Sequence, residues 1–257
     1  MLLKDKICVI AGAASLRGIG YATAELFARN GARLVVVDVA MDTPAIDAIA
    51  GSIERATGAP AIIRGVKCDI QQATDCDRVV DEALNAFGSV DVLVNCAGVV
   101  KAQPLLSISE ADYDRMLDIN LKGTFNICKS VLRVFAEKRS GAIVNLASVA
   151  AQRGGGLVGG AHYAASKGGV LSLTRSIARE FGPLGIRANA ICPSMIETGM
   201  LDGNVTQAKA DEIAASIPLQ RLGKPSDIAG TCLFLASELA AYITGATIDV
   251  NGGSHIH

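Results

Sequence analysis

Ile7-Cys-Val-Ile-Ala-Gly12-Ala-Ala-Ser-Leu-Arg-Gly18-Ile-Gly20 is the stretch of sequence that decides the fold. It begins with an apolar run, continues with a glycine-rich segment that predicts a turn, and leads into a helical pattern at Tyr21. A strand, a turn and a helix in this order open an α/β fold with a parallel sheet. The glycines let the backbone approach a pyrophosphate closely, and the start of the helix offers free N–H groups and a partial positive charge. Taken alone, such a turn is a weak sign of nucleotide binding.

The rest of the chain repeats this pattern, with short runs rich in valine and isoleucine alternating with longer amphipathic stretches. Strands of nearly continuous apolar character indicate that helices cover both faces of the sheet. We therefore predict a doubly wound Rossmann fold of the α/β class, a single domain over residues 1–257 with a seven-stranded parallel sheet. The predicted strands are Ile7–Ala11, Arg33–Val37, Ala61–Lys67, Val90–Val94, Ala142–Leu146, Arg187–Ile191 and Thr247–Val250.

Residues that begin and end helices fit between these strands. Gly31, Gly58 and Gly88 each follow a helical stretch and can take the left-handed conformation that ends it. Thr43-Pro44 predicts an N-cap followed by proline in the first turn, and Ser107-Ile-Ser-Glu110 predicts a capping box.

Charge and cysteine usage narrow the class of partner. The 24 lysine and arginine residues nearly balance the 25 aspartate and glutamate residues, so no excess of one sign attracts nucleic acid or an anionic membrane. The seven cysteines are scattered without a Cys-x-x-Cys pair, which predicts reduced, buried thiols and no metal site. The chain shows no signal-peptide pattern and no apolar run of about 20 residues. We therefore expect a cytoplasmic protein that binds a small molecule.

The predicted second strand leads into Asp38, eighteen residues after Gly20. A carboxylate at this place accepts hydrogen bonds from both hydroxyls of an adenosine ribose and repels a 2′-phosphate. It therefore predicts NAD rather than NADP as the cofactor. Arg17 argues in the opposite direction, because a cation in the glycine-rich turn can pair with such a phosphate. We give Asp38 the greater weight, since its charge would face the phosphate in either case.

A second motif, His162-Tyr-Ala-Ala-Ser-Lys-Gly-Gly169, opens a predicted helix. Tyr163 and Lys167 are four residues apart and therefore share one helix face. A phenol with an ordinary pKa near 10 is a poor base, but a nearby ammonium and an oxidised nicotinamide both favour the phenolate. The lysine can also hold the nicotinamide ribose. In isolation, a surface tyrosine and lysine on an amphipathic helix would be the better interpretation.

The two motifs do not stand alone, because Asn95-Cys-Ala-Gly98, Asn120 and Ser148 accompany them in order. Together these residues resemble the short-chain dehydrogenase/reductase family over residues 4–253. The resemblance implies an NAD-dependent oxidoreductase that acts on CH–OH groups. It also implies a homotetramer, built in part from the helices that contain residues 110–138 and 163–181.

The resemblance also implies roles for individual residues. Ser148 matches the serine that hydrogen-bonds the substrate oxygen and steadies its developing charge. Tyr163 matches the acid/base, and Lys167 matches the residue that lowers the pKa of that tyrosine and binds ribose. Asn120 matches the asparagine that holds a water in a proton relay from the lysine to solvent.

The cofactor contacts implied by the resemblance come from the glycine-rich turn and from the ends of the strands. Among them, Asp69-Ile70 would meet the adenine ring, and Asn95 with Gly98 the adenosine ribose. The segment from Pro193 to Thr198 would hold the nicotinamide carboxamide. The full set of expected contacts is Gly12, Ser15, Arg17, Gly18, Ile19, Gly20, Asp38, Asp69, Ile70, Asn95, Gly98, Tyr163, Lys167, Pro193, Ile196 and Thr198.

The chain departs from the family pattern in three places. Five residues rather than three separate Gly12 from Gly18, which leaves open whose amides touch the pyrophosphate, with Ser15 and Arg17 as candidates. This longer spacing also resembles bacterial enoyl-acyl-carrier reductases, but those place six residues between tyrosine and lysine, and the three here favour carbonyl chemistry. Ser194 replaces a usual glycine. The spacing of fifteen residues from Ser148 to Tyr163 is slightly longer than usual, and the glycine-rich loop 153–160 contains the extra residues.

The function expected from these observations is interconversion of a secondary alcohol (a polyol, sugar or other hydroxy compound) and its carbonyl. One alternative is a 3-oxoacyl-thioester reductase acting on acyl-carrier-protein or CoA substrates, which a strong NADPH preference would favour. An alternative of another class is an NAD-binding regulatory or scaffold protein without turnover. In each case a loop and helix insertion at about 194–216 is expected to cover the ligand.

The remaining polar residues near the expected site have simpler interpretations. His162 precedes the tyrosine but lies about 100° away around the helix, so we expect it to miss the substrate. His255 and His257 are too few to hold a structural metal. Gln152 and Arg153 lie near the predicted mouth of the site and could contact a polar substrate, although solvation at the surface is the simpler reading.

Overall fold

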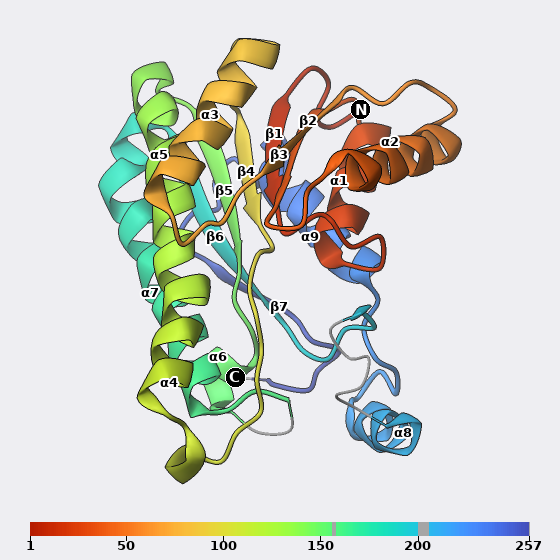
Figure 1. Cartoon of the computed structure of the whole chain (residues 1–257), viewed down its shortest axis with the longest axis vertical. Coiled ribbons are helices and arrows are strands. Elements are labelled where there is room, and N and C mark those ends of the chain that lie inside the picture. The colour runs from red at the N-terminus through yellow and green to blue at the C-terminus, as the bar shows by residue number, and fades with distance from the viewer. Residues whose placement is uncertain (156–157, 200–205, 257) are drawn as a thin grey trace.

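Seven parallel strands form one sheet in the spatial order β3-β2-β1-β4-β5-β6-β7 (Figure 1). The computed structural model describes residues 1–155, 158–199 and 206–256. Within these ranges the strands are β1 (Ile7–Ala11), β2 (Arg33–Asp38), β3 (Ile63–Lys67), β4 (Val92–Asn95), β5 (Gly141–Leu146), β6 (Ile186–Pro193) and β7 (Thr247–Val250). The predicted doubly wound, single-domain fold is confirmed, and the predicted strand ends differ from the observed ones by at most two residues.

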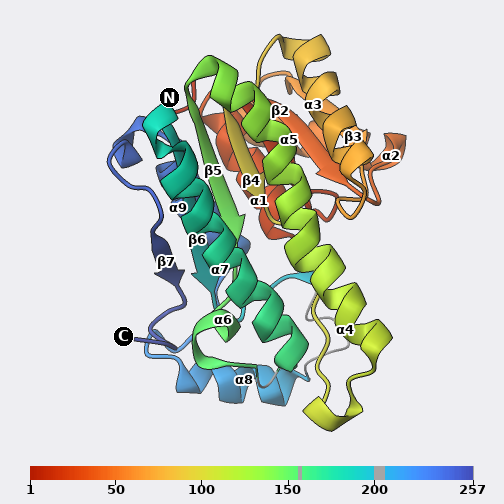
Figure 2. The same ribbon diagram turned by 90° about the vertical axis from the view of Figure 1, so that its left-hand side faces the viewer.

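Helices cover both faces of this sheet. On one face lie α1, α2 and α9, and on the other lie α3, α5 and α7, which are turned toward the viewer in Figure 2. The described helices are α1 (Ile19–Arg29), α2 (Thr43–Thr57), α3 (Ala73–Phe87), α4 (Glu110–Leu117), α5 (Gly123–Lys138), α6 (Ala150–Arg153), α7 (Ala161–Phe181), α8 (Gln207–Ser216) and α9 (Pro225–Ala236). None of them is long and apolar enough to cross a lipid bilayer.

Side chains of the central strands alternate between two apolar layers. Ile10 of β1 belongs to the layer that contains Phe27 of α1, and Val9 belongs to the layer that contains Phe135 of α5. All four side chains are 0% exposed. This two-sided burial explains why the strands are apolar along their length rather than at every second residue.

Two predicted helix caps were wrong by one or two residues. The cap of α2 is Asp42 rather than Thr43, and its carboxylate accepts a hydrogen bond from a first-turn N–H at 2.9 Å. The cap of α4 is Ser109 rather than Ser107, with a corresponding bond of 3.1 Å. At both starts several capping-type residues are adjacent, and sequence spacing does not tell which of them takes the extended backbone. The expected positive φ angles are confirmed at Gly31 (+85°), Gly58 (+71°) and Gly88 (+80°).

Three predictions fall partly outside the described residues. They concern residues 200–205 of the expected covering segment 194–216, residues 156–157 of the glycine-rich loop, and His257.

The strand order reverses between β1 and β4, and the chain forms its glycine-rich turn at this point. In open α/β sheets, ligands bind beyond the carboxyl ends of the strands at such a reversal. The turn is packed without room for side chains, since a Cβ on Gly20 would lie 2.2 Å from the Gly12 carbonyl oxygen. Gly12 itself has φ +78°, and a Cβ there would lie 2.6 Å from the Ala97 nitrogen. These glycines bring the start of α1 directly against the end of β1.

Gly20→Ala is therefore expected to destabilise the protein by about 1–3 kcal/mol, because the new methyl group meets backbone atoms that cannot move aside cheaply. The matched control is Gly230→Ala on α9, where a Cβ would meet nothing within 4 Å. That change is expected to stabilise the protein by about 0.5–1 kcal/mol through helix propensity. Urea unfolding of both variants measures the difference, and equal stabilities would contradict the packing described here.

Candidate active site

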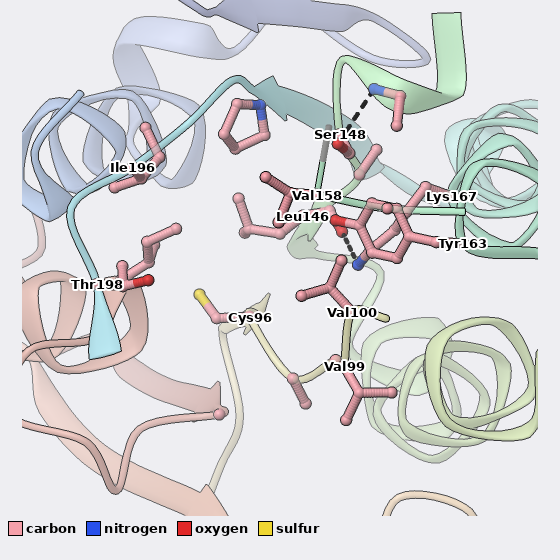
Figure 3. Close-up of a pocket in the computed structure, with 18 of the residues that line it drawn as sticks. Cys96, Val99, Val100, Leu146, Ser148, Val158, Tyr163, Lys167, Ile196 and Thr198 are labelled. Atoms are coloured by element: carbon pink, nitrogen blue, oxygen red, sulfur yellow. Dashed lines mark hydrogen bonds between the residues drawn. The ribbon is translucent and has the colours of Figure 1, made fainter. Parts of the chain in front are cut away.

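A cavity of about 910 Å³ opens at the carboxyl ends of the strands (Figure 3). Its walls come from the glycine-rich turn, the ends of β2, β4, β5 and β6, the start of α7, and the end of α8. This volume lies in the upper part of the range of about 300–1,000 Å³ that is typical of ligand pockets. The cavity is therefore large enough for an extended ligand.

Most of the residues expected from the sequence line this one cavity. They are Gly12, Ser15, Gly18, Ile19, Gly20, Asp38, Asp69, Ile70, Gly98, Ser148, Tyr163, Lys167, Pro193, Ile196 and Thr198. Three expected residues do not line it. Arg17 is exposed on the glycine-rich turn, whereas Asn95 and Asn120 are buried behind the wall.

Ser148, Tyr163 and Lys167 meet on one wall of the cavity, opposite Ile196 and Thr198 (Figure 3). Ser148 follows β5, and its hydroxyl accepts a hydrogen bond from the Ala150 N–H at 3.1 Å. The other two residues project from the first turns of α7. Two segments far apart in the sequence thus bring a hydroxyl, a phenol and an ammonium to one place.

Burial is the largest influence on the pKa values of Tyr163 and Lys167. It raises the pKa of the Tyr163 phenol above its ordinary value, while a hydrogen bond with Ser148 acts in the opposite direction. Burial also lowers the pKa of Lys167 to about 8. The Lys167 ammonium donates to the Leu146 carbonyl at 2.8 Å. In the protein without a cofactor, burial is the largest influence on the pKa of the phenol, and it favours the protonated form.

Asn120 is buried behind the cavity and hydrogen-bonds to two of its walls. It lies in a π-helical turn, Asp118–Lys122, between α4 and α5. Its Oδ1 accepts from the Val99 N–H at 2.8 Å, and its Nδ2 donates to the Val99 carbonyl at 2.9 Å. The same Nδ2 donates to the Ser166 hydroxyl at 3.0 Å, and that hydroxyl donates to the Tyr163 carbonyl at 2.7 Å. The asparagine thereby fixes the loop after β4 against the first turn of α7.

Asp38 is held at the end of β2 by two backbone hydrogen bonds. Its Oδ2 accepts from the Ala14 N–H at 3.1 Å, and its Oδ1 accepts from the Ala40 N–H at 3.0 Å. Val39 and Ala40, which follow it, bring no positive charge. The carboxylate therefore faces the glycine-rich turn in a defined orientation.

The other candidates separate into those near the cavity and those away from it. His162 is 1% exposed and packs on Gly160, outside the cavity lining. Gln152 donates to Asp249 at 2.8 Å, whereas Arg153 lines the cavity. In the described ranges no three His, Cys, Asp or Glu side chains are placed to hold a metal ion.

Sequence reasoning missed several residues that the fold brings to the site. Val100, Arg115 and Ser254 line the cavity, and Ser166 links Asn120 to α7. Ser166 stands inside the motif Tyr163-Ala-Ala-Ser-Lys167, so its place one turn from the tyrosine was available as a signal. The other three come from distant segments, and no local pattern marks them.

The buried ammonium of Lys167 has a measurable cost for stability. Its folded pKa of about 8 lies below the ordinary value of 10.5. The ionised lysine therefore destabilises the native state below pH 8, by about 3 kcal/mol at most, and this loss is recovered as the pH rises from 8 to 10.5. Lys167→Met is expected to unfold at higher urea than the wild type at pH 7, with an advantage that shrinks toward pH 10.5. A difference that stays constant with pH would contradict the lowered pKa.

Comparison with known proteins extends over nearly the whole chain. A family model described as enoyl-(acyl carrier protein) reductase matches residues 12–255. An uncharacterized short-chain type dehydrogenase/reductase of Sinorhizobium fredii is 44% identical over 257 residues, 100% of both chains. The 3-oxoacyl-[acyl-carrier-protein] reductase FabG of Thermotoga maritima is 38% identical over 254 residues, 98% of this chain and 99% of that one.

A solved structure shows the same architecture. It is titled short-chain dehydrogenase/reductase SDR:Glucose/ribitol dehydrogenase, from Brucella melitensis, and it superposes with a TM-score of 0.88 at 40% identity. The match covers 100% of this chain and 99% of that one. The chain therefore belongs to the short-chain dehydrogenase/reductase family, whose members are oxidoreductases that use nicotinamide cofactors.

Proposed function

We propose that the protein is an NAD-dependent dehydrogenase that interconverts a secondary alcohol and its carbonyl compound, with Tyr163 as the acid/base. The observation that carries this proposal is the meeting of Ser148, Tyr163 and Lys167 on one wall of the cavity. A hydroxyl, a phenol and an ammonium in one apolar enclosure are the groups that proton transfer to or from an alcohol oxygen requires.

The cavity fits a dinucleotide. The glycine-rich turn packs tightly without side chains, so its backbone could approach a pyrophosphate closely, and the start of α1 offers free N–H groups to it. Asp38 would accept hydrogen bonds from the adenosine ribose and would repel a 2′-phosphate, which supports NAD over NADP. The adenine would lie against Asp69 and Ile70, and the nicotinamide carboxamide against Pro193, Ile196 and Thr198.

The remaining cofactor contacts in this proposal come from the turn and from α7. Ser15, Arg17 and Ile19 flank the pyrophosphate, Asn95 and Gly98 shape the wall beside the adenosine ribose, and Lys167 holds the nicotinamide ribose. A Cβ on Gly98 would lie 3.2 Å from the Lys167 Nζ, so the glycine leaves room for this ammonium.

We call the wall that carries Ser148, Tyr163 and Lys167 the catalytic wall. In the proposed reaction each of its side chains has a distinct task. The Ser148 hydroxyl holds the substrate oxygen, and the Tyr163 Oη takes the hydroxyl proton during oxidation or returns it during reduction. The bound nicotinamide supplies the hydride acceptor or donor. Lys167 places a positive charge beside the phenol, and Asn120 keeps the loop after β4 and the helix start in register. Its side-chain amide bonds to protein atoms, which favours a positioning role alongside any water-holding one.

The alternatives are weaker on the same observations. Similarity to the FabG reductase supports a 3-oxoacyl-thioester reductase. Such a reductase is expected to use NADPH, whose 2′-phosphate the Asp38 carboxylate would repel. Three residues between Tyr163 and Lys167 favour carbonyl chemistry over the double-bond reduction named in the family description. A regulatory protein that binds NAD without turnover would have no need of the intact catalytic wall.

Assembly and location belong to the same proposal. We expect a homotetramer in the cytoplasm, with α4, α5 and α7 contributing to its interfaces. In support, Tyr113 of α4 and Phe125 of α5 leave 44% and 46% of their surface exposed. A shallow apolar hollow formed by Leu117, Leu121 and Phe125 lies on the same side.

Tyr163→Phe tests the catalytic assignment. Removal of the phenolic hydroxyl is expected to lower kcat by a factor of about 100 to 10,000, the usual contribution of general acid/base catalysis. Binding of NADH, followed by its fluorescence, should stay within about twofold of the wild type. The assay is a screen of polyols, sugars and hydroxyacyl thioesters with NAD and NADP side by side. Full activity in the variant would refute the assignment.

Asp38→Asn tests the cofactor assignment. The wild type is expected to prefer NAD over NADP by about 100-fold in kcat/KM, because like charges would otherwise face each other. Loss of the carboxylate charge should reduce this ratio by about tenfold or more, mainly through a lower KM for NADP. An unchanged ratio, or a wild type that prefers NADP, would contradict the role given to Asp38.

A further inference from the structure

Among the charged residues that line the described part of the cavity, the carboxylates and the cations come from different elements of the fold. Asp38 and Asp69 lie after β2 and β3, at the end proposed for adenosine. The other charged lining residues in the described ranges are Lys167, Arg115 and Arg153, all of them cations. Apart from the two aspartates at the end proposed for adenosine, the described lining carries positive charge without a carboxylate, which favours an anionic group elsewhere in the cavity.

Arg153 follows Ser148 by five residues in the sequence. It ends α6, and that helix is tied to β7 by the hydrogen bond from Gln152 to Asp249. The Arg153 guanidinium donates one bond, at 2.9 Å, to the Ser254 carbonyl near the end of the chain. A guanidinium has five N–H donors in a fixed fork, so this bond orients the group and leaves donors for a ligand.

Arg153 is exposed to solvent, and the cavity that it lines is largely apolar. Other residues of the cavity lining include Val100, Val158, Met195, Ile213 and Ile217. An apolar wall favours a hydrocarbon body in the ligand. The wall and the guanidinium together therefore favour a ligand with a carbon chain and an anionic end.

We propose that Arg153 makes the enzyme selective for secondary alcohols and ketones that carry an anionic group, a carboxylate or a phosphate, on a short apolar chain. Both anions match the planar fork of a guanidinium and can accept two parallel hydrogen bonds from it. The inference rests on the proposed function, because it assumes that the alcohol is bound at Ser148 and Tyr163. It adds the chemical class of the substrate and the residue that selects it.

A binding experiment tests the anion preference without relying on turnover. Calorimetry, with and without saturating NADH, compares hexanoate and hexyl phosphate with hexanamide and hexanol, which have similar chains but no charge. The wild type should bind at least one of the two anions about tenfold more tightly than the neutral compounds. Arg153→Ala should abolish this preference, and Arg153→Lys should keep part of it.

Arg115 provides the competing arm, since it lines the cavity from α4 rather than from α6. Arg115→Ala should leave the anion preference unchanged. A preference that is absent in the wild type, that survives in Arg153→Ala, or that disappears in Arg115→Ala overturns the proposal. The relative affinity for hexanoate and hexyl phosphate identifies which anion the site accepts.

Turnover then separates this inference from the proposed function. The substrates are a hydroxyhexanoate with its hydroxyl on the penultimate carbon and the methyl ester of the same acid. In Arg153→Ala the ratio of kcat/KM for acid over ester should fall about tenfold, through KM, while kcat/KM for the ester stays unchanged. An unaltered ratio overturns the selectivity. Retained anion binding without turnover of any alcohol would instead refute the dehydrogenase and leave the anion site standing.

Discussion

The hydrogen bonds of Asn120 hold the two halves of the site in register. The side-chain amide bonds to both backbone groups of Val99, and through Ser166 it reaches the first turn of α7. A π-helical turn places the asparagine there, and π-helical turns are frequent at functional sites. The wall that carries the tyrosine and the lysine therefore keeps a fixed position relative to the end of β4.

Placing a phenol and an ammonium in this enclosure costs free energy, since burial raises the pKa of Tyr163 and lowers that of Lys167. Both changes favour the neutral forms of these groups. A positively charged ligand beside the phenol would shift the balance back toward the phenolate. In the proposed function, an oxidised nicotinamide bound in the neighbouring cavity would therefore favour the phenolate form of Tyr163.

The strands and their parallel arrangement were predictable from the sequence, because apolar runs between helical stretches are local patterns. The glycines and Tyr163-x-x-x-Lys167 are local patterns too, and most of the residues expected from these motifs and from the family resemblance line the cavity. Helix caps were missed where neighbouring residues compete, as at Asp42 and Ser109. The links from Asn120 to Val99 and from Arg153 to Ser254 were not predictable. They join residues 21 and 101 positions apart, and sequence spacing carries no information on such contacts.

The acid/base role proposed for Tyr163 depends on how its pKa responds to the cofactor. The most direct measurement is an ultraviolet titration of the phenolate, taken as the difference between the wild type and Tyr163→Phe, with and without NAD. The pKa of the phenol should lie above the ordinary value of 10.0 in the protein alone and should decrease clearly when NAD is bound. A pKa that is the same in both states would contradict the claim that this phenol is the acid/base of a nicotinamide-dependent reaction.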